Sequence, residues 1–242
     1  MRYFITFSYD GSSFNGFQRQ SGLKTVQGVI EDALTSLNGS FVPLCASGRT
    51  DKGVHAFGQC AHFDLGREVK VYNLKKYLNN SFDGEIFVKD VSLVDDGFHA
   101  RYDVKSKTYS YFINMGEFNP CDRNYIYQYC EGLDISLMKD ASLCLIGEHD
   151  FRSFCTDEKN KDNCVRTIYS IDFEVSGDIL KITFVGNGFL RKMIRNIVAI
   201  LIEIGSSKKD VSYMEEVLNN TSRSGNLKCA PGCGLYLEKV TY

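Results

Sequence analysis

Residues 2–9 of the chain read RYFITFSY, and residues 25–39 read TVQGVIEDALTSLNG. The first stretch puts aromatic or aliphatic residues at every second position, which predicts a strand with one buried face. The second stretch places apolar residues three and four positions apart. This spacing is typical of an amphipathic helix, with Thr25 as its N-cap and Gly39 at its end. A strand followed by a helix therefore opens the fold.

The order of elements that begins here continues along the chain. In the first half, strands are expected at residues 41–46, 59–65 and 85–94, and a helix near 74–78. In the second half, strands are expected at 107–114, 165–175, 179–185 and 235–240, and helices at 135–146, 190–204 and 212–218. The turn residues Ser176-Gly177-Asp178 predict a hairpin between two of these strands.

Both halves therefore read β-α-β-β-α-β, the split βαβ pattern. Such halves build mixed or antiparallel sheets with helices packed on one face, so the expected fold class is α+β. The join falls near residues 100–106, which gives an N-terminal half of residues 1–105 and a C-terminal half of residues 106–242. A cleft between two such halves is a common place for a site.

The composition limits the class of protein. The chain has 242 residues, of which 43% are hydrophobic and 24% charged, as in an ordinary soluble globular protein with a substantial core. No apolar run reaches about 18 residues, and the first residues lack the layout of a signal peptide. We therefore expect a cytoplasmic protein without a membrane partner. The net charge of −2 argues mildly against a nucleic-acid binder but does not exclude a local basic surface.

Nine cysteines are scattered along the chain. Only Cys229 and Cys233 lie close together in sequence, whereas zinc sites usually show two tight pairs. We therefore expect no metal site, and most cysteines as small buried residues in a reducing compartment. No Ser-His-Asp order, Walker loop or H-E-x-x-H motif is present, which leaves those enzyme classes without support.

The loop at residues 47–56 reads SGRTDKGVHA and concentrates small, charged and hydroxyl side chains between two expected strands. Its glycines let the backbone turn tightly. Arg49 lies two residues from Asp51, so an ion pair would keep the carboxylate ionised, and an ionised carboxylate acts as nucleophile or base. The alternative is an aspartate that only shapes a turn. The loop taken alone favours this second interpretation.

Two further positions are each open to two interpretations. Tyr109 and Tyr111 share one face of an expected strand, which is typical of a core face but also of an aromatic platform for a nucleobase. Arg195 lies beside the apolar stripe of an expected long helix, where a snorkelling arginine is the ordinary interpretation. Gly186 and Gly188 precede that helix and give a weak signal for phosphate binding at its start.

Several motifs, taken in order, match those of a known enzyme family. The opening motif is Tyr9-Asp10-Gly11 with Phe14, Gly16, Phe17, Gln18 and Gln20, and the loop core at residues 48–55 is Gly-Arg-Thr-Asp-x-Gly-Val-His. Further matches follow at residues 98–101, 107–111, 147–151, 193–198 and 234–237. Across essentially its whole length, the chain resembles the tRNA pseudouridine synthase A family of bacteria. Phe17 stands where many members have tryptophan. The motif density overturns the turn-only interpretation of Asp51.

The resemblance implies a pseudouridine synthase fold, with two ferredoxin-like halves around a central RNA-binding cleft. It also implies a homodimer, no cofactor and no metal. The implied reaction isomerises uridine to pseudouridine in the anticodon stem-loop of tRNA, at tRNA positions thirty-eight to forty. Asp51 carries over as the catalytic residue and Tyr109 as the ring that stacks on the target uracil. Arg49 carries over as the residue that helps to extrude the base, and Arg195 as a cation near Asp51.

Two competing interpretations remain. The first is a catalytically silent RNA-binding protein of the same fold. The intact Arg49-Thr50-Asp51 sequence disfavours it, because binding alone would not need the carboxylate. The second is an unrelated thiol- or metal-dependent enzyme that uses the cysteines, which the missing ligand spacing disfavours.

Overall fold

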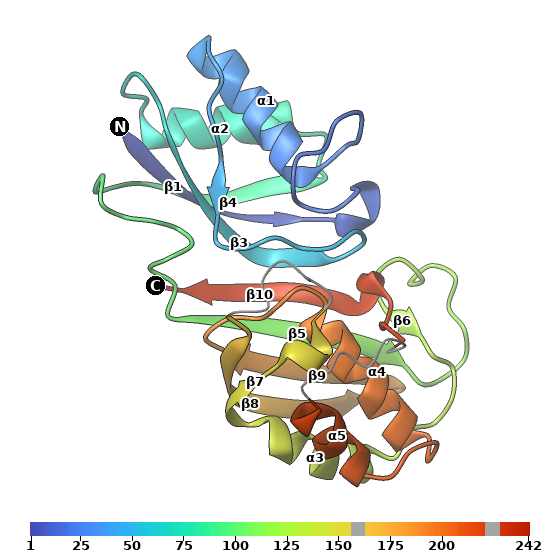
Figure 1. The fold of residues 1–242 in the computed structure, drawn as a ribbon. Coiled ribbons are helices and arrows are strands. Elements are labelled where there is room, and N and C mark those ends of the chain that lie inside the picture. The colour runs from blue at the N-terminus through green and yellow to red at the C-terminus, as the bar shows by residue number, and fades with distance from the viewer. Residues whose placement is uncertain (156–162, 221–227) are drawn as a thin grey trace. The chain divides into compact units, whose positions relative to one another are not determined.

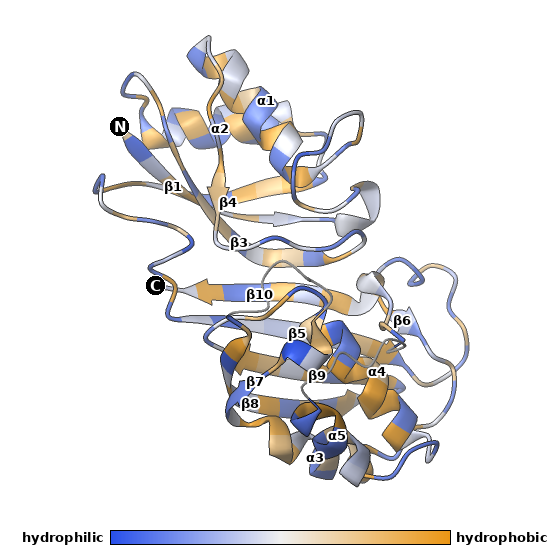
Figure 2. Cartoon of the chain, in the orientation of Figure 1, coloured by the Kyte–Doolittle hydropathy of each residue, from blue (hydrophilic) through white to orange (hydrophobic). Residues whose placement is uncertain are grey.

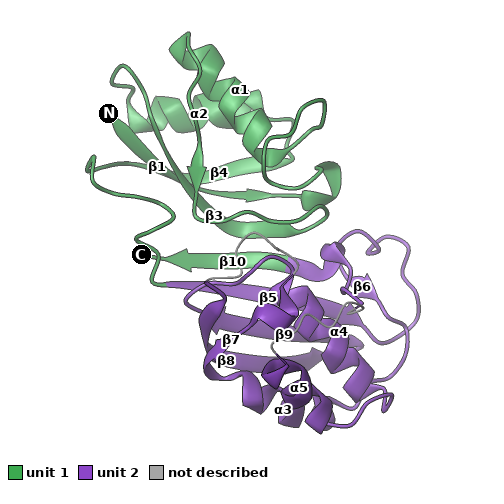
Figure 3. Ribbon diagram, in the orientation of Figure 1, with its two compact units in different colours: residues 1–105, 236–242 green, residues 106–235 purple. Residues whose placement is uncertain are grey.

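A computed structural model of the protein describes residues 1–155, 163–220 and 228–242. The chain divides into two compact units (Figure 3). The first unit comprises residues 1–105 together with residues 236–242, and the second comprises residues 106–235. Each unit combines a mostly antiparallel sheet with helices, which confirms the α+β class expected from the sequence.

The first unit is built on a sheet with the strand order β4-β1-β3-β10. β1 pairs with β3 and with β4 in antiparallel fashion, and the short β2 pairs with β3. Figure 1 shows α1 and α2 together on one face of this sheet. The elements are β1 (Arg2–Tyr9), α1 (Val26–Asn38), β2 (Cys45–Ala46), β3 (His55–Asp64), α2 (Val71–Ser81), β4 (Ile86–Val94) and β10 (Leu235–Thr241).

The two opening stretches fold as their patterns predict. Every second residue of β1 is buried, from Tyr3 to Tyr9, so the alternation does produce one core face. The hydroxyl of Thr25 caps α1 by accepting the backbone N–H of Gly28 at 3.3 Å. Gly39 ends the helix in the left-handed region, with φ 78°.

The second unit is built on an antiparallel sheet with the strand order β5-β9-β8-β7, and β6 adds to β5 in parallel. The predicted hairpin joins β8 to β9, with Gly177 at φ 57°. The elements are β5 (Ser106–Asn114), β6 (Tyr127–Gln128), α3 (Ile135–Ser142), β7 (Gly147–Asp150), β8 (Val165–Ser176), β9 (Ile179–Gly186), α4 (Met193–Gly205) and α5 (Ser212–Asn219).

Of the helices that the structure describes in the second unit, α4 is the most apolar (Figure 2). Met193, Ile197, Val198 and Leu201 are fully buried, as the predicted stripe requires. α3 and α5 pack against this helix and against each other. Among the described residues, no helix is both long and apolar enough to cross a membrane.

β3 begins at His55, earlier than the strand expected at residues 59–65, and β6 and β7 are additional strands. Three further differences have a local cause. The strand expected at residues 41–46 is reduced to Cys45–Ala46, because Pro43 lacks the N–H that a sheet ladder needs. The helix expected from residue 190 begins at Met193, since Lys192 before it takes a left-handed φ of 62°. The helix expected at residues 135–146 ends at Ser142 and continues as a 3₁₀ turn.

The compact units differ from the halves 1–105 and 106–242 expected from the sequence in the place of the last strand, β10. β10 pairs in parallel with β3, with Tyr236 opposite His55 and Leu237 opposite Ala56. Residues 236–242 therefore belong to the first unit. Alternation along a strand predicts which residues face the core, but it contains no information about the partner strand.

Thr25→Ala is expected to lower the free energy of unfolding by about 1 kcal/mol, because the N-terminal N–H of α1 loses its side-chain acceptor. Urea denaturation followed by circular dichroism measures this change. Ser36→Ala is the matched control in the same helix, since Ser36 is exposed and its hydroxyl donates to the carbonyl oxygen of Asp32 within the helix. A loss as large for Ser36→Ala as for Thr25→Ala would contradict the capping role.

Candidate active site

Asp51 lies in the loop between β2 and β3 and is half-buried. Its carbonyl oxygen accepts the backbone N–H of Val54 at 3.2 Å, which closes a turn around Lys52 and Gly53. Gly53 has a φ of 77°, a conformation that favours glycine. The turn expected from the sequence therefore exists. It fixes the backbone of Asp51 and is compatible with a catalytic carboxylate at the same position.

The segment after β1 lies directly against this loop. The backbone N–H of Phe17 donates to the carbonyl oxygen of Thr50 at 3.0 Å. Gly16 has a φ of 91°, and a Cβ there would stand 3.2 Å from the same oxygen. A Cβ on Gly11 would stand 2.0 Å from the carbonyl oxygen of Val54, far inside van der Waals contact. Glycine at position 11 thus permits a backbone approach that holds the loop from one side.

Two buried polar side chains hold the rest of the loop. Gln59 accepts a hydrogen bond from the hydroxyl of Ser47 at 2.7 Å and donates one to the carbonyl oxygen of Gly48 at 3.1 Å. The hydroxyl of Tyr9 forms a 2.8 Å hydrogen bond with Oγ1 of Thr50. Residues 47–50 of the loop are therefore tied to β1 and β3, two strands of the same sheet.

His55 is the last residue of the loop motif and the first residue of β3, and it is also buried. Its Nδ1 accepts the backbone N–H of Gly11 at 3.0 Å and lies 3.3 Å from a carboxylate oxygen of Asp10. Its ring stacks on Tyr236 with centroids 4.6 Å apart. The Tyr9-Asp10-Gly11 motif and the Asp51 loop motif, which are separate in sequence, thus form one packed structure.

Arg49 and Asp51 lie on the same loop of the first unit, and the side chain of Arg49 is exposed. Exposure is compatible with a role in contacting RNA phosphate or filling the space left by a base. The ion pair between Arg49 and Asp51 stays a prediction.

Tyr109 lies in β5 of the second unit, opposite Phe184 of β9. It is 8% exposed, and its ring meets Phe189 edge-to-face with centroids 5.4 Å apart. Tyr111, two residues along the same face, is fully buried, and its hydroxyl donates to the carbonyl oxygen of Pro231 at 2.8 Å. Burial raises the pKa of Tyr111 well above its ordinary value. The face is therefore a core face at Tyr111, while Tyr109 retains a small exposed area.

Arg195 lies in the first turn of α4 and is half-buried. Its Nε donates to the carbonyl oxygen of Ala230 at 2.7 Å, and the backbone N–H of Ala230 donates to the carbonyl oxygen of Arg195 at 3.1 Å. The reciprocal pair fixes the arginine against a neighbouring segment of its own unit. It is thus more constrained than a snorkelling side chain on a solvated face. The catalytic and binding roles of Tyr109 and Arg195 stay predictions.

The fold brings together one cluster of possible metal ligands that the sequence pattern does not indicate. Among the described residues, Cys45, His62 and His99 each bring one ligand atom to within 4.8 Å of the others. Sγ of Cys45 lies 3.6 Å from Nε2 of His99. The three positions show no ligand spacing in sequence, so only the fold brings them together.

The hydrogen bonds of this cluster do not fit a resident metal. Nδ1 of His62 accepts the backbone N–H of Ala100 at 3.1 Å, and Nδ1 of His99 accepts those of Arg101 and Tyr102 at 3.2 and 3.3 Å. In a neutral imidazole the proton must then lie on Nε2, whereas a metal-bound histidine needs one bare nitrogen and donates with the other. Burial lowers the pKa of His62 and raises that of the Cys45 thiol, which favours neutral groups here.

The expectation that most cysteines are buried is wrong. Cys60, Cys155 and Cys164 are buried, Cys121 is exposed, and the other five are half-buried. Small polarizable side chains of this kind pack at the edge of a core as well as inside it.

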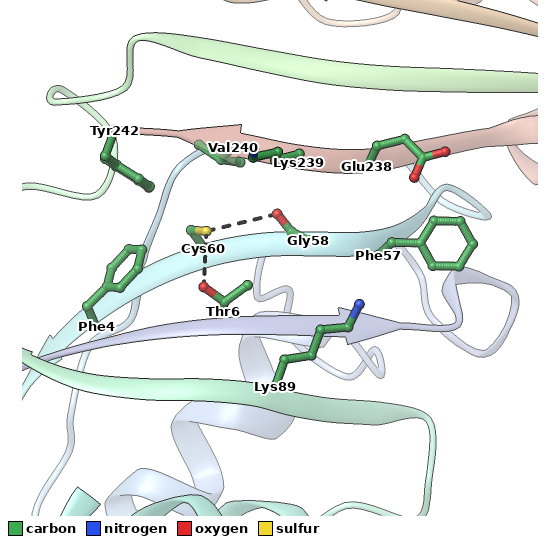
Figure 4. A pocket seen from close by; sticks show the side chains of 10 residues that line it. All are labelled: Phe4, Thr6, Phe57, Gly58, Cys60, Lys89, Glu238, Lys239, Val240 and Tyr242. Atoms are coloured by element: carbon green, nitrogen blue, oxygen red, sulfur yellow. Dashed lines mark hydrogen bonds between the residues drawn. The ribbon is translucent and has the colours of Figure 1, made fainter.

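A shallow hollow of about 350 Å³ opens on the first unit (Figure 4). Phe4, Phe57 and Tyr242 line it together with the stems of Lys89 and Lys239. Neither Asp51 nor Arg49 contributes to this lining. The hollow is therefore separate from the loop.

The comparisons with known proteins agree with one another. A family model described as tRNA pseudouridine synthase matches residues 5–103 and 141–242. A protein of Geobacillus sp. (strain WCH70) named tRNA pseudouridine synthase A is 41% identical over 239 residues, which cover 98% of this chain and 96% of the relative. A protein of Streptococcus agalactiae serotype Ia with the same name is 42% identical and covers 100% of this chain and 95% of its own length. A protein of Brevibacillus brevis, again of that name, is 40% identical with 97% of both chains covered.

A solved Cbf5–Nop10–Gar1 complex aligns with 83% of this chain and 45% of its own, at 11% identity and a TM-score of 0.37. A likeness at that level says nothing about function. The match to the family model does bear on the site, because residues 5–103 include the Asp51 loop, the segment after β1 and β3, which hold the loop. With most of its length matched by the family model, and with relatives of about 41% identity along the whole chain, the protein belongs to the tRNA pseudouridine synthase family.

Proposed function

We propose that this protein converts uridine to pseudouridine in tRNA, with Asp51 as its essential carboxylate. The observation that carries the proposal is the fixed Asp51 loop, held by Gly11, Gly16 and Tyr9 in a chain of this family. A catalytic group must be held within a fraction of an ångström of its productive position. The contacts around Asp51 supply this kind of constraint.

The chemistry matches a single carboxylate. The N1–C1′ bond of uridine breaks, the uracil turns, and a bond forms between C5 and C1′ while the proton on C5 is lost and N1 gains one. The reaction is an isomerisation, so it consumes no oxidant and no group donor. An ionised carboxylate can add to the substrate or remove a sugar proton as the base detaches, and related chemistry at C1′ occurs in glycoside hydrolysis.

The other site residues receive roles in the same proposal. The ring of Tyr109 holds the detached uracil by stacking, which leaves the edge of the base free to turn. Arg49, exposed on the Asp51 loop, fills the space that the flipped base leaves and contacts phosphate. Arg195 supplies the cation of the site. These assignments rest on the resemblance of the motifs.

The finer description of the substrate and the assembly also belongs to the proposal. The target is uridine in the anticodon stem-loop, at tRNA positions thirty-eight to forty. The protein acts in the cytoplasm, where tRNA is found, as a homodimer without cofactor or metal. The competing proposal is a catalytically silent RNA-binding protein of the same fold. Release of tritium from tRNA labelled at C5 of uridine separates the two, because it reports the isomerisation directly.

Asp51→Asn is expected to reduce tritium release by about 10³-fold or more, while the variant still folds and binds tRNA. Asparagine retains the size and turn-forming ability of aspartate but loses the charge and the nucleophilic oxygen. Asp178→Asn in the β8–β9 turn is the matched control, since it makes the same change at an exposed aspartate outside the Asp51 loop. Near-normal turnover in folded Asp51→Asn would rule out the catalytic role.

Tyr109→Phe is expected to retain much of the turnover, and Tyr109→Leu to lose roughly 5- to 150-fold, because base stacking is worth about 1–3 kcal/mol. Single-turnover kinetics with labelled tRNA measures both variants. Phe and Leu at Tyr111, buried on the same face of β5, serve as controls for packing damage. Equal rates for Tyr109→Phe and Tyr109→Leu would show that the ring face is not used.

Activity is expected to persist in excess chelator, and the purified protein to contain less than stoichiometric metal. The physical reason is that Nδ1 of both His62 and His99 already accepts backbone N–H groups. Tritium release with and without EDTA, together with elemental analysis, tests this. Loss of activity on chelation that zinc restores would contradict it.

A further inference from the structure

Thr50, the residue that precedes Asp51, is held by a side chain from the end of the first strand. The hydroxyl of Tyr9, at the end of β1, forms a 2.8 Å hydrogen bond with Oγ1 of Thr50. The two residues are 41 positions apart. The bond reaches the Asp51 loop through a side chain, whereas the contacts of Gly11, Gly16 and Phe17 reach it through backbone.

The surroundings of Tyr9 keep this bond well defined. Tyr9 is 5% exposed, and its ring packs against those of Phe7 and Phe17, with centroids 6.1 and 6.3 Å away. Burial raises the pKa of Tyr9 to about 12, so the phenol stays neutral and retains its proton. A buried neutral hydroxyl in a fixed ring is a directional hydrogen-bonding group that water does not displace.

Thr50 is thereby fixed at two points. Its side chain bonds Tyr9, and its carbonyl oxygen accepts the backbone N–H of Phe17 at 3.0 Å. The next residue is Asp51, whose own carbonyl oxygen closes the turn with Val54. The torsions that aim the carboxylate therefore start from a residue that cannot rotate freely.

We propose that Tyr9 is a positioning residue for catalysis, which acts through the hydroxyl of Thr50 to set the orientation of Asp51. The inference rests on the proposed function, because it takes Asp51 as the catalytic carboxylate. Tyr9 itself is not a group that touches the substrate. Its removal should lower the rate of the chemical step and leave tRNA binding unchanged.

Tyr3 provides an internal control on the same strand. It lies on the same face of β1, is fully buried, and its hydroxyl bonds the backbone of Val69, donating to the carbonyl oxygen at 2.9 Å and accepting the N–H at 2.7 Å. Tyr3→Phe therefore removes a comparable buried hydroxyl without touching the loop. A purely structural cost would appear in both variants, whereas a positioning effect would appear only at Tyr9.

The experiment compares kcat and KM for tritium release, together with melting temperatures, in Tyr9→Phe, Tyr3→Phe, Thr50→Val and Thr50→Ser. Tyr9→Phe and Thr50→Val should each lower kcat about tenfold with KM for tRNA within about twofold of the wild type. Thr50→Ser retains the hydroxyl and should recover most of the rate. Tyr9→Phe should have at most a small further effect in the Thr50→Val background, since both changes break the bond between Tyr9 and Thr50, and Tyr9→Phe also removes an interaction with Gln59.

Three results would overturn the inference. The first is a wild-type kcat in folded Tyr9→Phe, the second is an equal fall of kcat in Tyr3→Phe, and the third is additivity with Thr50→Val. If Tyr9→Phe does not fold, the Thr50 variants test the inference, and an equal fall of kcat in Thr50→Val and Thr50→Ser would overturn it. Asp51→Asn in the same assay keeps the two proposals apart. If folded Asp51→Asn is active, the proposed function is wrong. If Asp51→Asn is inactive and Tyr9→Phe is fully active, only the inference about Tyr9 is wrong.

Discussion

The first unit depends on a close approach of two backbones, in which a Cβ at position 11 would stand 2.0 Å from the carbonyl oxygen of Val54. Only glycine permits this approach. It lets the segment after β1 lie flat on the loop before β3, so that Nδ1 of His55 can accept the N–H of Gly11 and Phe17 can bond Thr50. A larger residue at position 11 would separate the two motifs and loosen every contact that follows from their packing.

This arrangement explains why so much of the loop's polar surface is satisfied inside the protein. Ser47 and Gly48 bond Gln59, Thr50 bonds Tyr9 and Phe17, and Asp51 bonds Val54 through its carbonyl oxygen. Ordering a flexible loop when the substrate binds costs conformational entropy and weakens binding. Here contacts with the neighbouring strands already order the loop in the free protein, so the loop behaves as an extension of the sheet.

The parts of the fold that could be predicted from sequence are those governed by local periodicity. β1, α1 with its Thr25 cap, and the β8–β9 hairpin follow from spacing and turn residues. Single residues decided the local departures, such as the proline that shortens β2 and the left-handed Lys192 that delays α4. β6 and β7, of two and four residues, are too short for any periodic signal.

The candidate site divides in the same way. The motif around Asp51 could be found in sequence, and so could the motif that contains Tyr9, but nothing in either pattern places one against the other. The Tyr9–Thr50 bond spans 41 residues, and the cluster of Cys45, His62 and His99 has no regular spacing at all. Contacts of this kind arise from the pairing of strands and the path of loops, which periodicity does not encode.

The pairing of β10 with β3 affects the order in which the protein can assemble during translation. Residues 106–235, the second unit, separate the two strands in sequence, so β3 leaves the ribosome long before β10 is made. Until then β3 lacks its β10 neighbour at His55 and Ala56, and an exposed strand edge is a template for association with other nascent chains. The strand that follows the Asp51 loop therefore acquires its last neighbour late. Factors that shield nascent chains would have to cover this edge throughout the synthesis of the second unit.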